Sequence, residues 1–399
     1  MRAACIAFAS FLFWFSPNVF AKDELSFEQF LKAALEQNLD LKIEAAKSSA
    51  SQSSAGGFNI PPPMVGYMRM TDQSGSSANG FEVSQTIPFP TKISHGRSAR
   101  GLEAKAQDEA RLAMESEIRA KAKVIYFNLW ATQEKENALK EKKSAIESHL
   151  RLARAGARSD SFLRIHLLKA ESDLDLLENE LIAAHQEVVE KETAMANFLN
   201  VDASSFHPML QDPPQTSIPE EKTLQSPHQI EFAKFNLESM KARESEGRST
   251  WFPDLYLRYK EIGQTQLMPK TSEVMVGISL PFLFPWDASA TSGKASGQRM
   301  QAEFEFEQTK RRIDSERSTL LSKASSLKKQ LDNINQKLLP RAERRMKLVH
   351  NLAPRDMETL QDHRETMEAF PDLKLKALEL RRTYEETVAE LMKFERGSR

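Results

Sequence analysis

The chain of 399 residues has a single cysteine, Cys5, which lies close to the N-terminus. Disulfide frameworks and thiolate metal sites each need several cysteines, so the sequence excludes both as sources of stability. An excess of one charge is also missing, because 55 lysines and arginines face 56 acidic residues and give a net charge of -1. The composition therefore favours neither a nucleic-acid-binding protein nor an acidic disordered tail.

Long apolar runs are missing from all but the first residues of the chain. Charged residues make up 28% of the sequence, whereas each span of a helical membrane protein needs about 20 mostly apolar residues. A polytopic helical membrane protein is therefore excluded. The one apolar stretch, Ala3–Phe15, is followed by Val19-Phe20-Ala21, which has the residue spacing of a signal-peptidase site, and this predicts a signal peptide over residues 1–21. The alternative is a retained anchor helix, but Pro17 interrupts it too early to span a bilayer.

Glycine and proline are absent between Gly101 and Gly156, and the apolar residues there recur in alternating steps of three and four. This is the heptad pattern of helices that wind around each other. The same pattern returns after Gly156 and again in two later stretches. The sequence therefore predicts four long helices, at about residues 96–153, 160–200, 293–350 and 357–396.

Four shorter runs have a period of two. In the clearest, Glu273–Phe282, five apolar side chains point to one side and polar or small side chains mostly point to the other. Such alternation predicts β-strands with one apolar face, and their length matches a tilted strand that crosses a membrane. The predicted strands lie at about residues 63–72, 80–89, 254–262 and 273–282.

The order of helix, two strands, long helix, turn and long helix occurs twice, which indicates an internal duplication. The first repeat covers residues 22–206 and the second covers residues 227–399. Between them, residues 207–226 are rich in proline and read as a linker. The predicted fold class is mainly α with a small β part, in duplicated helix-strand-strand-long helix-helix halves.

Four strands with one apolar face do not close on themselves, because single-chain membrane barrels have about eight strands or more. Open edges would leave backbone groups unpaired in hydrocarbon. A barrel shared among identical chains solves this problem, and the same oligomer supplies neighbours for helices that are too long to be covered within one chain. The sequence therefore predicts a tube.

Several segments resemble the TolC-like family of outer membrane efflux proteins, and the resemblance covers nearly the whole chain after residue 21. The segments are the helix Phe27–Ala50, the strand ends Pro88–Pro90 and Pro281–Trp286, and the tip sequence Leu150–Glu171. The resemblance implies a homotrimer with an α-helical tunnel and a shared twelve-stranded outer membrane β-barrel. The implied function is a passive exit duct of a tripartite efflux pump or a type I secretion system. The implied partners are an inner membrane transporter, a periplasmic adaptor and outer membrane lipid, with no nucleic acid. The implied location is the outer membrane, with a large periplasmic portion.

In this family, two turns between long helices narrow the periplasmic end of the tunnel and carry gating links and a cation-attracting ring. The resemblance places these turns at Ala153–Ser161 and Leu352–Asp362. If Arg355 matches the family's tip arginine, Asp362 falls at the acidic ring, where three copies would select cations. The alternative is that these charges belong to an ordinary solvated helix face. The candidate residues are Arg158, Asp160, Arg355, Asp356, Glu358 and Asp362.

Sequence motifs of enzymes are missing, including glycine-rich nucleotide loops, the nucleophile elbow and the HExxH zinc motif. We therefore expect no catalysis and no cofactor. The eight histidines lack the i, i+4 spacing of a helical zinc site, so we expect surface histidines and no metal. A soluble periplasmic coiled-coil scaffold or adaptor is the alternative function, and it explains the heptads but not four strands placed in a duplication.

Overall fold

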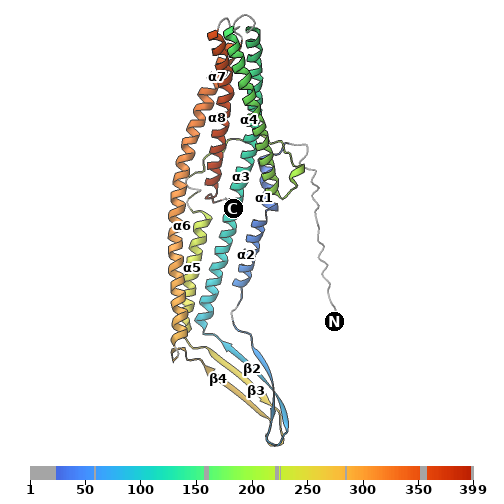
Figure 1. Cartoon of the computed structure of the whole chain (residues 1–399). Helices are drawn as coiled ribbons and strands as arrows, with labels where there is room; N and C mark the ends of the chain where they lie inside the picture. The colour runs from blue at the N-terminus through green and yellow to red at the C-terminus, as the bar shows by residue number, and fades with distance from the viewer. Residues whose placement is uncertain are drawn as a thin grey trace. The chain divides into compact units, whose positions relative to one another are not determined.

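A computed structural model describes residues 24–57, 60–156, 161–220, 224, 226–283, 285–350 and 357–396. The predicted signal peptide and Cys5 lie outside these residues. The described chain is mostly helical and has one small antiparallel sheet (Figure 1), which confirms the predicted class of mainly α with a small β part.

The chain folds into two compact units, and each takes segments from both halves of the sequence. The helical unit combines the N-terminal segment up to Asn38 with Ile118–Ile218 and Leu320–Met392. The sheet-bearing unit combines Leu39–Glu117 with Pro219–Thr319 and the residues from Lys393 onward. The units therefore do not follow the two repeats of the sequence.

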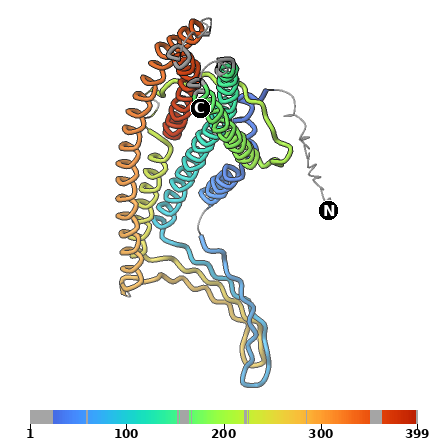
Figure 2. The backbone as a smooth tube through the Cα atoms, turned by 45° about the horizontal axis from the view of Figure 1, so that its top comes forward, coloured from blue at the N-terminus to red at the C-terminus, as the bar shows by residue number. Residues whose placement is uncertain are grey.

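Eight α-helices and four strands form the described structure, and Figure 2 traces their order along the backbone. The helices are α1 Phe27–Gln37, α2 Leu39–Ala55, α3 Pro90–Gly156, α4 Ser161–Leu199, α5 His228–Arg248, α6 Pro285–Asn333, α7 Leu339–His350 and α8 Met357–Met392. The strands are β1 Met64–Thr71, β2 Ser77–Ile87, β3 Leu255–Ile262 and β4 Thr271–Ile278. None of the helices within the described residues is long and apolar enough to cross a membrane.

The long helices begin and continue differently from the prediction. We expected starts at about residues 96 and 293, but α3 begins at Pro90 and α6 at Pro285. Proline suits the first position of a helix because its fixed φ is helical and its missing N–H is not needed there. The helix expected over residues 293–350 is also divided by a π-helical turn, Ile334–Leu338, which separates α6 from α7. Heptad spacing did not reveal this turn.

The four strands form one antiparallel sheet in the order β1-β2-β3-β4, so its two edges are β1 and β4. The central pairing joins the two sequence repeats, because β2 aligns with β3 in a register that places Val83 opposite Tyr259. Gly80 permits this close pairing, since a Cβ atom there would lie 2.6 Å from the carbonyl oxygen of Glu261. A side chain at this position would push the two strands apart.

One face of the sheet is mostly apolar across all four strands, apart from Arg69, Gln85 and Glu261, and its apolar side chains are exposed or half-buried in the single chain. The registers align Tyr67 with Phe81, Val83 with Tyr259, and Tyr259 with Val274, so these side chains share one face. The other members are Val65 on β1, Ile87 on β2, Leu255 and Leu257 on β3, and Val276 and Ile278 on β4. An apolar surface of this extent on a soluble protein would mark an interaction site.

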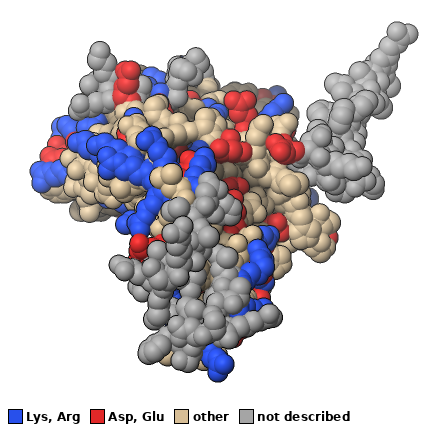
Figure 3. All heavy atoms as spheres, turned by 90° about the horizontal axis from the view of Figure 1, so that it is seen from above, with Lys and Arg blue, Asp and Glu red and all other residues tan. Residues whose placement is uncertain are grey.

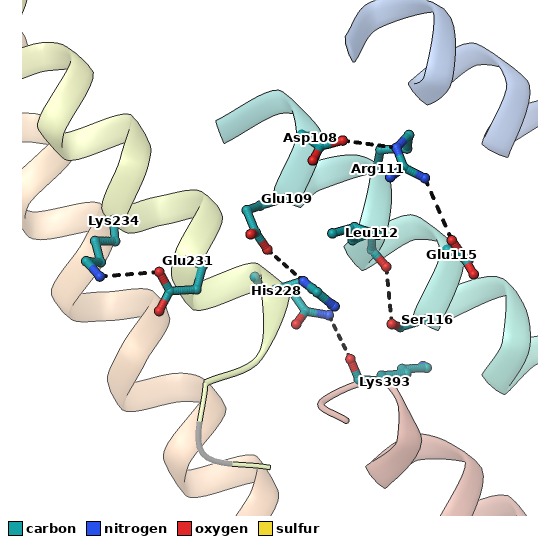
Figure 4. Close-up of polar contacts among 11 residues, drawn as sticks. Asp108, Glu109, Arg111, Leu112, Glu115, Ser116, His228, Glu231, Lys234 and Lys393 are labelled. Atoms are coloured by element: carbon teal, nitrogen blue, oxygen red, sulfur yellow. Dashed lines mark hydrogen bonds and ion pairs between the residues drawn. The ribbon is translucent and has the colours of Figure 1, made fainter. Parts of the chain in front are cut away.

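Polar contacts hold the start of α5 against α3 in the sheet-bearing unit (Figure 4). The His228 Nδ1 lies 2.6 Å from a carboxylate oxygen of Glu109, and both side chains are buried. Next to it, the Gln229 side chain donates a hydrogen bond to the carbonyl oxygen of Lys393, just beyond the end of α8. Farther along α5, Glu244 pairs with Arg299 of α6 at 3.2 Å.

An aromatic cluster forms the core of the helical unit. Phe30 of α1 is fully buried and its ring centroid lies 6.0 Å from that of Tyr126 and 6.1 Å from that of Phe198. Phe127 and Met195 belong to the same cluster and are also buried. The core therefore joins the short α1 to the middle of α3 and the end of α4.

Candidate functional site

The structure describes only part of the predicted tip site. Arg158, Asp160, Arg355 and Asp356 lie outside the described residues. Glu358 is in the first turn of α8, where its side chain is not described, and Asp362 is exposed one turn farther along. The gating and ring roles of these six residues therefore remain predictions.

Two histidines lie together close to the predicted tip, one on α3 and one on α8. The rings of His149 and His363 are stacked, with centroids 5.9 Å apart and an interplanar angle of 23°. Their exposed fractions are 3% and 5%. His149 lies near the end of α3 and His363 near the start of α8, so this contact shows that α3 ends and α8 begins at the same end of the helical unit.

The expectation of surface histidines is wrong for His149, His228 and His363, which are all buried. His363 carried a usable signal, because the heptad seam of α8 extends upstream through positions 370 and 366 to reach it. His149 and His363 are more than 200 residues apart in the sequence, so no local spacing indicates their contact. Among the residues described, no group of three metal-ligating side chains is arranged to hold an ion.

Ion pairs connect α8 to α3 and α4 farther from the predicted tip than the histidine pair. Arg364 of α8 lies 3.1 Å from Asp173 of α4, and Lys142 of α3 lies 2.8 Å from Asp372 of α8. Burial raises the pKa of the Glu368 carboxyl, against the opposing effect of the Arg364 guanidinium. Each partly exposed pair contributes about 0 to 1 kcal/mol, so these contacts orient the helices more than they stabilise them.

A buried ion pair lies deeper in the helical unit, where α3, α8 and the segment between the two repeats meet. The Nζ of Lys123 lies 2.9 Å from a carboxylate oxygen of Glu385, and their side chains are 2% and 0% exposed. Lys123 also donates to the hydroxyl of Thr216 at 2.6 Å, and the backbone N–H of Thr216 donates to Glu385 at 2.9 Å. Tyr384 donates its hydroxyl hydrogen to the carbonyl of Thr216 at 2.7 Å. We call Lys123, Thr216, Tyr384 and Glu385 the charge clamp.

A second set of contacts anchors the same segment closer to the N-terminus. The backbone N–H of Leu25 donates to the carbonyl of Met209, and Leu25 forms a parallel bridge with Leu210. Arg381 of α8 lies over the ring of Trp130 at 4.3 Å from its centroid and pairs with Asp212 at 3.2 Å. Residues 207–218 are therefore held on the helices by several contacts along the segment. These contacts supply hydrogen-bond partners to polar groups that are removed from water.

Substituting Tyr126 by phenylalanine is expected to lower the free energy of unfolding by about 1 to 3 kcal/mol. The Tyr126 hydroxyl lies 2.8 Å from the carbonyl of Leu25 and 2.9 Å from that of Gln211. Both carbonyls would lose this hydrogen-bonding group, although the Leu25 carbonyl keeps the backbone N–H of Gln211 at 3.2 Å. Burial raises the pKa of Tyr126 to about 12, so the hydroxyl stays protonated at neutral pH. Guanidinium titration in detergent measures the loss. Tyr67→Phe, at an exposed position, is the control, and an equal effect of both variants would contradict the role of this hydroxyl.

No protein-family model and no curated protein matches the sequence. Solved structures do match along nearly the whole chain. The outer-membrane channel OprN superposes with a TM-score of 0.76 at 13% identity, over 92% of this chain and 89% of OprN. The open-state MtrE outer membrane channel of Neisseria gonorrhoeae gives a TM-score of 0.75 at 16% identity, over 92% and 88% of the two chains. The CmeC outer membrane channel of Campylobacter jejuni gives 0.74 at 16% identity, over 92% and 85%.

These likenesses extend through both units, since more than nine tenths of the chain is covered in each comparison. At 13–16% identity the likeness concerns the fold and not individual side chains. The chain has the TolC-like fold of the outer membrane channels.

Proposed function

We propose that the chain is an outer membrane channel, in which three copies form a passive exit duct. The three four-stranded sheets would join into a twelve-stranded barrel in the outer membrane, and the long helices would form a periplasmic tunnel. The likeness to outer-membrane channels supports this proposal. The predicted signal peptide over residues 1–21 would direct the chain across the inner membrane, and the two repeats would each contribute two strands.

The observation that carries the proposal is the apolar face of the sheet. Side chains that alternate between an apolar and a polar face are typical of strands between lipid and a water-filled lumen. The polar face carries Arg258, Lys260 and Glu273, whose side chains suit such a lumen. Strands β1 and β4 have no further partner strand within the described chain, and edges in hydrocarbon need one.

As partners we propose an inner membrane transporter and a periplasmic adaptor, in a tripartite efflux pump or a type I secretion system. A duct that only guides its cargo supplies no energy, so the transporter must supply it. A soluble periplasmic scaffold is the alternative function, but it would place the apolar face of the sheet in water.

Cell fractionation followed by light scattering tests the proposal. We expect the protein in the outer membrane fraction and, after detergent extraction, a mass of three protomers. Purified protein in planar lipid bilayers should then conduct ions. A monomer or dimer in the soluble periplasmic fraction would refute the channel and favour the scaffold.

Asp362→Asn is expected to lower the preference of the channel for cations. Three copies of Asp362 would form a ring of negative charge, and the amide removes that charge while keeping the size of the side chain. The reversal potential in a salt gradient across a planar bilayer measures the selectivity. Asp314→Asn, at a half-buried position on α6 far from the turns along the sequence, is the control. Equal selectivity of Asp362→Asn and the unmodified channel would assign Asp362 to an ordinary solvated helix face.

A further inference from the structure

Three long polar side chains interrupt the apolar face of the sheet, and two of them have partners within the sheet-bearing unit. The Gln85 amide donates to two backbone carbonyl oxygens, at 2.6 and 2.9 Å. The Glu261 carboxylate accepts a hydrogen bond from the Tyr259 hydroxyl at 2.8 Å and pairs with Lys270 at 2.7 Å. The third, Arg69 of β1, has neither an ion pair nor a side-chain hydrogen bond with any residue that the structure describes.

The surroundings of Arg69 differ from those of many cations on the helices. Helical cations often have a carboxylate beside them, as in the i, i+4 pairs Lys347–Glu343 and Arg311–Glu307. Figure 3 shows lysine and arginine side chains with acidic side chains close beside several of them. Arg69 instead lies on a face that is mostly apolar. Because a guanidinium stays charged, it requires water or an anion at such a place.

Arg69 belongs to a group of four polar residues at the end of β1 and the start of β2. The register places Asn79 opposite Arg69. Thr71 and Ser77 form the next pair on the same face, with their hydroxyl oxygens 2.9 Å apart, and all four residues are exposed. Opposite residues have Cβ atoms about 5 Å apart, and alternate residues of a strand are about 7 Å apart, so one sugar with its phosphate can contact all four. We call these four residues the polar patch.

An aromatic pair and then an aliphatic pair follow the polar patch along the same face of the sheet. Tyr67 and Phe81 lie opposite each other next to the patch, and both are exposed. Val65 and Val83 form the following pair. Aromatic side chains at the border of an apolar band are typical of the interface between membrane and water. The polar patch therefore begins where the apolar band ends, at the depth of lipid headgroups.

The polar patch lies at the end of the sheet that is far from the helices of the same unit. Strand β1 follows α2 and strand β2 precedes α3, whereas the loop of residues 72–76 connects the two strands at their other ends (Figures 1 and 2). With the helices in the periplasm, as proposed above, this loop is on the outside of the cell. The polar patch would then face the outer leaflet of the outer membrane.

We propose that the polar patch binds the phosphorylated sugar headgroup of an outer-leaflet lipid. The planar guanidinium of Arg69 can donate two parallel hydrogen bonds to one phosphate. The Asn79 amide and the hydroxyls of Thr71 and Ser77 supply donors and acceptors for sugar hydroxyls. The apolar side chains farther along the face would contact the acyl chains of the same lipid.

The depth of Arg69 agrees with this assignment. An arginine on the lipid-facing side of a barrel is strongly unfavourable at the middle of the bilayer and is tolerated close to the interface. There its long side chain brings the charge to the level of the headgroups. The inference rests on the proposed function and adds a lipid site to the outer surface of the channel.

Native mass spectrometry of the full chain in detergent micelles tests the proposal, with lipid A that carries two phosphates as the probe. We expect Arg69→Gln to raise the apparent Kd about 10- to 100-fold, because the variant removes a charge-assisted contact to phosphate. Asn79→Ala should raise it about 2- to 10-fold. Arg258→Gln, at an arginine of β3 on the other face of the sheet, is the matched control and should leave the Kd unchanged. An unchanged Kd for Arg69→Gln would overturn the site.

Removing the phosphates from the lipid tests the contact that Arg69 makes. The unmodified chain should bind dephosphorylated lipid A about 10- to 100-fold more weakly than the phosphorylated form. Arg69→Gln should cause no further loss with the dephosphorylated lipid, because both changes remove the same contact. Losses that add would contradict the pairing of Arg69 with phosphate.

Two further probes distinguish a glycolipid from other sources of phosphate. Inorganic phosphate that displaces lipid A at equal concentration would show that the patch binds a free anion. Phosphatidylglycerol that binds as tightly as lipid A would show that the patch does not recognise the sugar. Either result would overturn the assignment to a phosphorylated glycolipid.

The outcomes separate this inference from the proposed function. A conducting three-copy channel whose binding of lipid A is insensitive to Arg69→Gln would overturn the lipid site and leave the channel intact. A soluble periplasmic monomer in which Arg69→Gln still weakens the binding of lipid A would support recognition of the headgroup and refute the channel. A soluble monomer that binds no lipid A would overturn both.

Discussion

Replacing Lys123 by methionine is expected to lower the free energy of unfolding by about 3 to 5 kcal/mol. The carboxylate of Glu385 is 0% exposed and lies 2.9 Å from the Lys123 ammonium, so the variant would leave a buried charge without its counter-ion. The hydroxyl of Thr216 would lose its donor as well. The size of the effect follows from burial, because removing one partner of a buried pair costs far more than removing one partner of an exposed pair.

Guanidinium titration of the detergent-solubilised protein measures this loss as a shift in the unfolding midpoint. Lys135→Met is the matched control, since Lys135 also lies on α3 and pairs with Glu187 at 2.8 Å while 47% exposed. We expect a loss below about 1 kcal/mol for that variant. Similar losses for Lys123→Met and Lys135→Met would show that Glu385 reaches solvent. The charge clamp would then contribute no more to the free energy of unfolding than an exposed ion pair does.

Phe30→Ala is expected to lower the free energy of unfolding by about 3 to 5 kcal/mol. Phe30 is fully buried in the aromatic cluster, and its truncation leaves a cavity beside Tyr126 and Phe198. The capping box of Ser26 and Gln29 fixes the start of α1 locally, so the loss would arise from packing and not from unwinding of this helix.

The conservative variant Phe30→Leu separates packing from other effects. It keeps most of the apolar volume and should cost about 1 kcal/mol. Far-UV circular dichroism before denaturation confirms that α1 and the other helices remain folded. An equal loss for the alanine and leucine variants would mean that the ring contacts, and not the filled volume, determine the stability of this core.

Regular periodicity made the fold class predictable from the sequence. The heptad steps of α3 and α4 and the alternation around Val274 depend on neighbours within a few residues, so a single sequence contains the whole signal. The π-helical turn at Ile334–Leu338 left no such signal, because one wider turn changes the backbone without requiring a particular residue.

The charge clamp could not be derived from the sequence, because its contacts join segments that are far apart along the chain. The charge clamp brings together Lys123, Thr216 and Glu385, and each alone resembles an ordinary residue of a polar helix or linker. The proline-rich composition around Thr216 predicts a linker, but it does not reveal that the linker's backbone is held by buried charge. The roles of the tip charges stay predictions, because Arg158, Asp160, Arg355 and Asp356 lie outside the described residues.

The charge clamp has a mechanical consequence for the two long helices that it joins. Lys123 lies 33 residues before the end of α3, and Glu385 lies 28 residues after the start of α8. Each helix therefore extends about 40 to 50 Å from the charge clamp to the helix end at the turn. The clamp fixes one point of each helix, and the end at the turn lies at this distance from it. A rotation of about 5° at the clamp would displace the far end by about 4 Å over that length. A small change of angle at the buried pair would thus move the end of α3 and the start of α8 by about the radius of a hydrated ion. The Lys123–Glu385 ion pair itself would stay intact.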